Sequence, residues 1–218
     1  MQHAPKLTTE RLILRAWQDS DAEALYTAAS NPEIGPLAGW MPHTSVAQSA
    51  QIIDTIFNEP TIFAITLKND DTPIGCVGLK PCSPECKLPQ ESSNQHMELG
   101  YWLAQGYWGQ GIIPEAAERV IQYGFEQLAL QAIWGVHEVG NRRSRRVMEK
   151  LGMQRVAIAP HIKIDLLGDD VYWDEAINRI TRQEWEAEPQ LRDRLEAPSE
   201  GHVLAVPYVQ PEGVVNFE

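Results

Sequence analysis

The feature that most constrains this chain is a glycine-rich turn between a predicted strand and a long amphipathic helix. The strand is predicted over 97–103, glycines follow at 106, 109 and 111, and Pro114 lies in the first turn of the helix. Amide groups at a helix N-terminus lack intrahelical partners and carry partial positive charge, and glycine lets the backbone approach a ligand closely. Proline costs nothing at that position, because its missing N–H would have been unpaired. The turn therefore predicts a binding site for phosphate groups.

The elements around this turn predict an α/β (α+β) fold with a mixed, partly antiparallel sheet flanked by helices. Strands are expected at 7–17, 61–68, 73–80, 97–103, 132–138, 154–157, 161–166 and 171–180, and helices at 20–29, 45–58, from the glycine turn to about 128, and at 141–151. In the second helix, Ala47, Ile52, Ile53 and Ile56 are expected to face the core. No G-x-G-x-x-G joins a strand to a helix, which argues against a Rossmann-type nucleotide site.

The chain is expected to form one domain over 1–185 with a C-terminal extension over 186–218. After Trp185 the composition changes to acidic residues and Arg, and then to Pro, Gly and Val. We expect the extension to pack on the domain or on a partner chain, which leaves a homodimer open.

Composition excludes several classes of protein. The net charge of −12 argues against a nucleic-acid-binding protein, because phosphate contacts need clustered Lys and Arg. No apolar run reaches the roughly 18 residues of a membrane-spanning helix, and the N-terminus lacks the apolar stretch of a secretory signal. We therefore expect a cytoplasmic protein that does not bind a membrane. Cys82 and Cys86 with His96 lack a fourth ligand, so no structural metal site is expected.

Several separate motifs resemble the GNAT superfamily of N-acetyltransferases. Gly100-Tyr-Trp-Leu103 and Tyr107-Trp-Gly-Gln-Gly-Ile-Ile-Pro-Glu-Ala116 resemble its coenzyme A signature, in particular that of the Rim-type branch, which acetylates the N-termini of ribosomal proteins. Further motifs of the resemblance are Thr9-Glu-Arg-Leu-Ile-Leu-Arg15, Gly39-Trp-Met-Pro42, Asn141-Arg-Arg-Ser144, Lys150-Leu-Gly-Met153 and Trp173-Asp174. The likeness covers roughly 7–185. It departs from the superfamily pattern Q/R-x-x-G-x-G/A at Trp108 and Ile113.

The resemblance implies a GNAT fold, with splayed strands that hold acetyl-CoA as co-substrate. Backbone groups of Trp102 and Leu103 would bind the pantetheine arm, and Asn141 would contact it as well, although an N-cap role alone would also explain that residue. The pyrophosphate would be held by the amides of Gly109, Gln110, Gly111, Ile112 and Ile113, and Trp108 belongs to the same cofactor-binding set.

Acetylation of an amine by direct attack needs a general base for the amine proton and an acid for the leaving thiolate. Two carboxylates are candidates for the base: Glu98 on the signature strand, and Asp165 on a late strand near the position where the Rim-type branch places its base. The alternative to a catalytic role is the same for both residues, namely an ion pair between the carboxylate and an Arg at the strand edge. Ser144 matches the serine proposed as the acid in that branch and also belongs to the cofactor set, although a capping role in the first helical turn would explain it too.

We expect Trp40, Met41 and Trp173 to line the acceptor site. The expected function is acetyl transfer from acetyl-CoA to a primary amine, with a protein N-terminus as one acceptor class. A small amine, such as a polyamine, an aminoglycoside or an amino-acid derivative, is the alternative acceptor. The non-enzymatic alternative is a sensor that binds CoA and has lost catalytic turnover.

Overall fold

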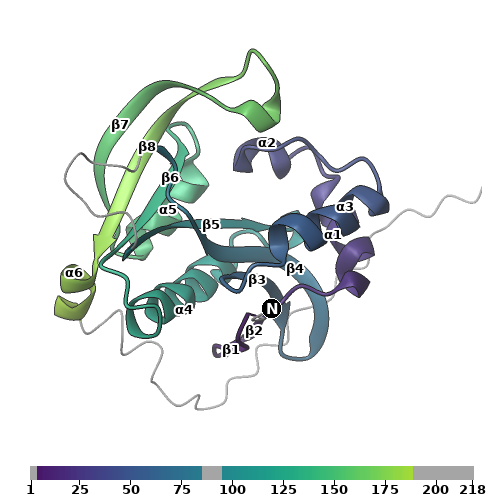
Figure 1. Cartoon of the computed structure of the whole chain (residues 1–218), viewed down its shortest axis with the longest axis horizontal. Coiled ribbons are helices and arrows are strands. Elements are labelled where there is room, and N and C mark those ends of the chain that lie inside the picture. The colour runs from purple at the N-terminus through teal and green to yellow at the C-terminus, as the bar shows by residue number, and fades with distance from the viewer. Residues whose placement is uncertain (1–3, 85–94, 189–218) are drawn as a thin grey trace, which may run out of the picture.

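The sheet of this protein is open and strongly splayed, and helices cover both of its faces (Figure 1). The structure is a computed structural model that describes residues 4–84 and 95–188. In this described part, eight strands pair in the order β1-β2-β3-β4-β5-β6-β8-β7. They are β1 (Leu7–Thr8), β2 (Leu12–Arg15), β3 (Ile62–Leu67), β4 (Asp70–Lys80), β5 (His96–Leu103), β6 (Ala132–Glu138), β7 (Gln154–Lys163) and β8 (Tyr172–Thr181). The expected mixed α/β fold is confirmed.

The splay lies between β5 and β6, which form the parallel pair of the sheet, whereas the other neighbours are antiparallel. These two strands pair only from His96 to Glu98 on β5 and from Ala132 to Trp134 on β6. The second half of β5 continues to pair with β4 up to Leu103, while β6 continues with β8 up to Glu138. The sheet therefore opens between the C-terminal halves of β5 and β6.

One face of the sheet is covered by α4 (Ile112–Glu126), which begins directly after the glycine turn. The helix packs against β4 and β5, and its apolar stripe lies in the main core, as the spacing predicts. The buried members of that stripe are Ile113, Ala117, Val120, Ile121 and Phe125. This packing fixes the N-terminus of α4 next to the end of β5.

The opposite face is covered by α1 (Ala22–Ala29), which packs against β4, and by α3 (Val46–Ile52), which packs against α1; a second apolar cluster lies here. A buried ion pair anchors the start of α1, because the Arg15 guanidinium on β2 donates to both carboxylate oxygens of Asp21 at 2.7 and 2.9 Å. Between α1 and α3 the chain forms α2 (Gly35–Ala38), a single turn that lies above the open end of the sheet (Figure 1).

The strand predicted over 7–17 is wrong as one element. Leu7 pairs with Leu14, so β1 and β2 are two short antiparallel strands. The Thr9 hydroxyl accepts a hydrogen bond from the Leu12 amide at 3.0 Å, and this side-chain contact closes the turn that the alternation of apolar residues concealed.

The helix predicted over 45–58 is confirmed in outline, but its last turn differs from the prediction. The chain leaves α3 at Ile52 and continues as one π-helical turn, η2 (Ile53–Phe57). The wider turn changes the direction of the side chains, so that Ile53 is buried as expected whereas Ile56 is exposed. The inward position predicted for Ile56 is therefore wrong. Ala47, in α3, is exposed as well, so its predicted inward position is also wrong.

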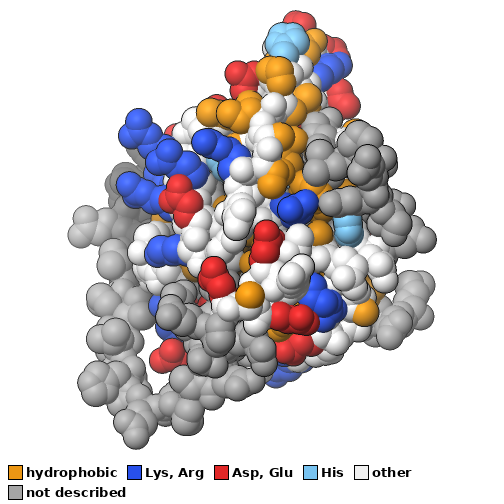
Figure 2. Space-filling model, turned by 90° about the vertical axis from the view of Figure 1, so that its left-hand side faces the viewer, with side chains coloured by type: hydrophobic (Ala, Val, Ile, Leu, Met, Phe, Trp, Pro, Cys, Tyr) orange, Lys and Arg blue, Asp and Glu red, His pale blue; other side chains and the backbone are white. Residues whose placement is uncertain are grey.

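The last strands form a long hairpin. The two strands predicted over 154–157 and 161–166 are one strand, β7, which is irregular between Ala159 and Ile162, where His161 has a φ of 58°. The strand ends at Lys163, and the turn η6 (Asp165–Leu167) leads to β8. Figure 2, viewed from the side of β7, shows the hairpin tip at the top and a strip of hydrophobic side chains below it.

Along the chain, the helix α5 (Arg142–Lys150) connects β6 to β7, and α6 (Arg182–Ala187) follows β8. No helix in the described part of the chain is both long enough and apolar enough to span a bilayer. Cys86 and the residues 189–218 of the predicted extension lie outside the described residues.

Candidate active site

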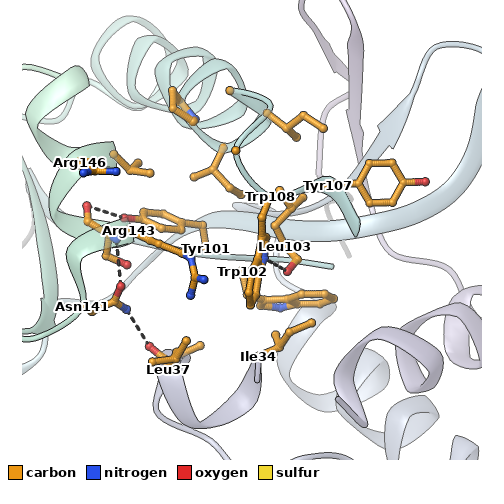
Figure 3. Close-up of a pocket in the computed structure, with 18 of the residues that line it drawn as sticks. Ile34, Leu37, Tyr101, Trp102, Leu103, Tyr107, Trp108, Asn141, Arg143 and Arg146 are labelled. Atoms are coloured by element: carbon orange, nitrogen blue, oxygen red, sulfur yellow. Dashed lines mark hydrogen bonds between the residues drawn. The ribbon is translucent and has the colours of Figure 1, made fainter. Parts of the chain in front are cut away.

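A cavity of about 400 Å³ opens at the splay of the sheet. Its walls come from the end of β5, the glycine turn, the N-terminal turns of α4 and α5, and the α2 turn. Figure 3 shows Tyr101 and Arg143 directed into this space, with Leu37 and Ile34 of the α2 region on the opposite side. Segments that are far apart in the sequence thus meet around one hollow.

The glycine turn presents its backbone to this cavity. Gly109 and Gly111 have φ values of 77°, in the left-handed region that glycine adopts without strain. Gly111 is the N-cap of α4, and no side-chain hydrogen bond caps the helix there. The first amides of α4 therefore keep their capacity to bind an anion.

Arg11 and Glu115 hold the turn from outside. The Arg11 Nε donates to Glu115 Oε2 at 2.7 Å, and Arg11 Nη1 donates to the Gln110 carbonyl oxygen at 3.0 Å. The Thr9 hydroxyl donates to the other Glu115 oxygen at 2.5 Å. The turn between β1 and β2 is thereby fixed to the first turn of α4, and the charge of Glu115 is balanced beside an anion site.

Trp108, which stands where the superfamily pattern has Gln or Arg, links the turn to the strand. Its indole Nε1 donates to the Leu103 carbonyl oxygen at 2.8 Å (Figure 3). The Arg143 guanidinium lies over the same ring at 4.2 Å from its centroid, a cation–π contact. Trp108 therefore positions both the end of β5 and a basic side chain of α5.

The start of α5 closes the cavity from the other side. The Asn141 side chain caps the helix by accepting from the Ser144 amide at 3.1 Å, as predicted, and its Nδ2 donates to the Leu37 carbonyl oxygen at 3.3 Å. The Tyr101 hydroxyl donates to the Ser144 carbonyl oxygen at 3.4 Å. Burial raises the pKa of Tyr101 to about 12, so this phenol stays protonated at physiological pH.

The predicted cofactor residues, except for Gln110, all line this cavity. They are Trp102, Leu103, Trp108, Gly109, Gly111, Ile112, Ile113, Asn141 and Ser144. The Gln110 side chain turns back instead and donates to the Gly106 carbonyl oxygen at 3.0 Å.

Three basic side chains of α5 in the wall of the cavity escaped the sequence analysis: Arg143, Arg146 and Lys150. The helix RRSRRVMEK carries five cations although the chain has a net charge of −12, and this local excess was the signal that could have found them. The combination of free helix amides, three cations and an apolar floor at Leu103 and Ile112 fits the pyrophosphate, phosphate and pantetheine parts of acetyl-CoA.

A second cavity of about 390 Å³ lies on the α1 and α3 side of β5 and shares Ala38, Tyr101 and Trp102 with the first. Of the three residues predicted to line an acceptor site, Trp40 and Met41 line this cavity and Trp173 does not. The Trp173 ring lies beside Gly39 instead, 3.6 Å from the position that a Cβ would take there. The two cavities meet at their three shared residues, Ala38, Tyr101 and Trp102.

Cys76 also lines the second cavity. Burial raises the pKa of its thiol to about 12, so the thiolate needed for nucleophilic catalysis does not form at physiological pH. Cys76 is therefore not a candidate nucleophile.

The two candidate bases lie outside the walls of both cavities. Glu98 is buried on β5, where its carboxylate contacts Lys80 Nζ at 2.8 Å and accepts from the Ser83 amide at 2.9 Å. Asp165 was expected on a strand, and this prediction is wrong, because β7 ends before it. It occupies the exposed turn η6, 3.4 Å from Lys163 Nζ.

Comparison with known proteins decides the family. The sequence model described as "Acetyltransferase (GNAT) domain" matches residues 11–154, which include the glycine turn and the start of α5. The chain belongs to the GNAT acetyltransferase family. The members of this family transfer an acetyl group from acetyl-CoA to an amine, and the first cavity is the place where this GNAT protein would hold that co-substrate.

Its relatives include bacterial N-acetyltransferases. The uncharacterised N-acetyltransferase p20 of Bacillus licheniformis is 32% identical over 154 residues, which cover 68% of this chain and 82% of p20. YdaF of Bacillus subtilis, which is provisionally named a ribosomal N-acetyltransferase, is 34% identical over 95 residues, or 44% of this chain and 50% of YdaF. This relative supports the resemblance of the GNAT chain to the Rim-type branch.

Solved structures agree with the GNAT fold. RimJ of Mycobacterium smegmatis in complex with CoA-disulfide superposes with a TM-score of 0.67 at 20% identity, covering 88% of this chain and 92% of RimJ. A GNAT-family acetyltransferase from Bacillus anthracis gives a TM-score of 0.68 at 21% identity and covers 83% of this chain and all of its own.

Proposed function

We propose that this acetyltransferase acts on the N-terminal amine of a protein, and that the reaction takes place where the two cavities meet. The observation that carries the proposal is this junction: a cavity suited to acetyl-CoA and a second, separate cavity share Ala38, Tyr101 and Trp102. The Rim-type resemblance and the ribosomal name of YdaF support a protein acceptor.

Acetyl-CoA supplies an acetyl group activated as a thioester. In the proposed mechanism, the backbone of Leu103, at the open edge of β5, binds the co-substrate, and its amide donates to the carbonyl oxygen as negative charge develops there. The backbone of Trp102 pairs with Cys76 of β4 instead. The amine nitrogen forms the new bond to the carbonyl carbon, while the bond from that carbon to sulfur breaks. Ser144, on the wall of the first cavity, gives a proton to the departing thiolate.

The amine must lose a proton before or during the attack. Glu98 and Asp165 are the proposed carboxylates for this step. Neither lines a cavity, so either would act through a bridging water. Glu98 lies two residues before Gly100, which lines the second cavity, and Asp165 lies next to Leu166, which also lines it.

The test measures the release of CoA by trapping its free thiol, with acetyl-CoA and a panel of peptides and small amines as substrates. We expect turnover with peptides that have a free N-terminus and none with the same peptides after Nα-acetylation, which is the matched control. Glu98→Gln and Asp165→Asn then identify the base by loss of turnover with unchanged acetyl-CoA binding. Turnover only with polyamines or aminoglycosides would contradict the protein acceptor, and tight CoA binding without any turnover would favour a sensor.

A further inference from the structure

The second cavity has a composition that restricts what can enter it. Most of its lining is aliphatic or aromatic. The lining residues come from α1, the end of α2 and the loop after it, α3, η2, β3, β4, β5 and the turn η6. The large apolar side chains are Leu25, Trp40, Met41, Ile52, Ile56, Phe57, Ile62, Trp102 and Leu166. A lining of this kind binds apolar groups by removing their surface from water.

The charged groups of this cavity are equally informative. No carboxylate occurs among its lining residues, all of which lie in the described part of the chain. Its lining carries one lysine, Lys80, whose Nζ contacts the buried Glu98 carboxylate at 2.8 Å. His43 is buried, its Nδ1 lies 2.8 Å from the Ser49 hydroxyl, and burial lowers its pKa, so it is uncharged at pH 7. A molecule with several positive charges would find no lining carboxylate to balance them.

The mouth of the cavity is apolar as well. Met41, Ile56 and Leu166 are 58%, 51% and 69% exposed, although they are large hydrophobic residues. They come from three separate segments, namely the loop after α2, the π-helical turn η2 and the turn η6, and yet they line one hollow. Exposed apolar residues that converge from distant segments mark a binding surface.

We infer that the acceptor carries an aliphatic or aromatic group next to its primary amine, and that this group fills the second cavity. The inference rests on the proposed function for the place of the acceptor, and it defines the acceptor further. A protein substrate would begin with a residue such as Leu, Ile, Met or Phe. A small-molecule substrate would be an alkylamine or arylalkylamine, whereas polyamines and aminoglycosides would be poor acceptors.

The first experiment compares acceptors for the full-length protein by CoA release. Peptides that differ only in the first residue (Leu, Phe, Ser, Lys or Glu) are measured beside phenylethylamine and spermidine. We expect kcat/KM to be about tenfold to a hundredfold higher for Leu or Phe than for Lys or Glu, since burial of one such side chain discriminates by roughly this factor. Phenylethylamine should likewise exceed spermidine.

The outcomes separate this inference from the proposed function. Higher kcat/KM for the Lys peptide than for the Leu peptide would overturn the inference and leave the protein acceptor intact. Turnover of phenylethylamine without turnover of any peptide would overturn the protein acceptor and support the apolar acceptor. Preference for spermidine over all the others would overturn both.

A variant pair tests the place of binding. Ile56→Lys introduces a cation at the mouth of the cavity at an exposed position, so the fold should tolerate it. We expect kcat/KM for the Leu peptide to fall at least tenfold and the Glu peptide to lose less or to gain, with the Kd of acetyl-CoA unchanged. Val156→Lys is the matched control, because Val156 is an exposed apolar residue on β7 that lines neither cavity. Equal losses in the two variants, or no loss in Ile56→Lys, would overturn the inference.

Discussion

The two cavities that meet at Tyr101 and Trp102 are constructed in different ways. About half of the residues that line the cofactor side come from one continuous stretch, 101–114, and the others come from the α2 region and from α5; its chemistry is that of backbone amides, glycines and cations. The second cavity, which is the proposed acceptor side, collects side chains from positions as far apart as Leu25 and Leu166, and its chemistry is that of apolar contact. A site made of backbone in a short segment constrains the sequence locally, whereas a site made of scattered side chains leaves each segment free to vary.

The difference predicts that the two sides can be damaged separately. Changes to the glycine turn or to the basic wall should weaken the binding of acetyl-CoA. Changes at the apolar mouth should alter acceptor kinetics alone.

The largest effect on the cofactor side is expected from Gly111→Val. Gly111 has a φ of 77°, which is highly unfavourable for a β-branched residue, and it is the N-cap of α4. A distortion there moves the amides that would bind the pyrophosphate. We expect the Kd of acetyl-CoA to rise tenfold or more in isothermal titration calorimetry.

Gly106→Ala is the control for this substitution. Gly106 belongs to the same turn, but it does not have a positive φ, and a Cβ added there would meet nothing within 4 Å. Its Kd should stay within a factor of two. Equal weakening in both variants would mean that any change in the turn disturbs binding, and the special role of the left-handed glycines would be contradicted.

A smaller effect is expected when cations are removed from the basic wall of the first cavity, which consists of Arg143, Arg146 and Lys150. Arg143→Ala combined with Arg146→Ala takes two cations out of the first cavity, and exposed charge contacts of this kind contribute about 0.2–1 kcal/mol each. We expect the Kd of acetyl-CoA to rise about threefold to tenfold and to depend less on salt than in the unaltered protein. Arg145→Ala is the matched control, because Arg145 lies on the same helix and does not line the cavity. An identical change in the control would contradict a specific role for the wall.

Much of the cofactor side and little of the acceptor side could be predicted from the sequence. The glycines, Pro114 and the stripe of α4 lie close together in the chain, so local rules place them correctly. The acceptor side depends on events that local rules do not contain. The π-helical turn at Ile53–Phe57 directs Ile56 outward, and the end of β7 at Lys163 puts Asp165 in a turn. Both events follow from tertiary packing, which overrides the periodicity of the segment.

The basic wall was missed for a different reason. The arginines of α5 are mostly exposed, and a helix with many charges usually indicates a solvated surface. The splay of β5 and β6 places α5 beside the glycine turn. Because of this position, the cations of α5 line the cavity and can bind a ligand there.

The smallest effect is expected on the stability of the acceptor side. Burial lowers the pKa of His43 in the folded protein, whereas in the unfolded chain the imidazole keeps its ordinary pKa of about 6.5. The unfolded state therefore binds more protons below that pH, and stability is lost as the pH falls through about 6.5. We expect the free energy of unfolding to decline less between pH 7 and pH 5 in His43→Gln than in the unaltered protein, as measured by urea denaturation. An equal decline in the two proteins would contradict the role of His43.

The division of the site into a cofactor side and an acceptor side is tested most directly by hydrogen exchange with and without CoA, read by mass spectrometry. The structure predicts slower exchange on CoA binding in segments that cover 106–116 and 141–150, with no change in the segment 39–57 around Trp40, Met41 and Ile56. Protection of 39–57 without protection of 106–116 would place CoA in the wrong cavity and contradict the account.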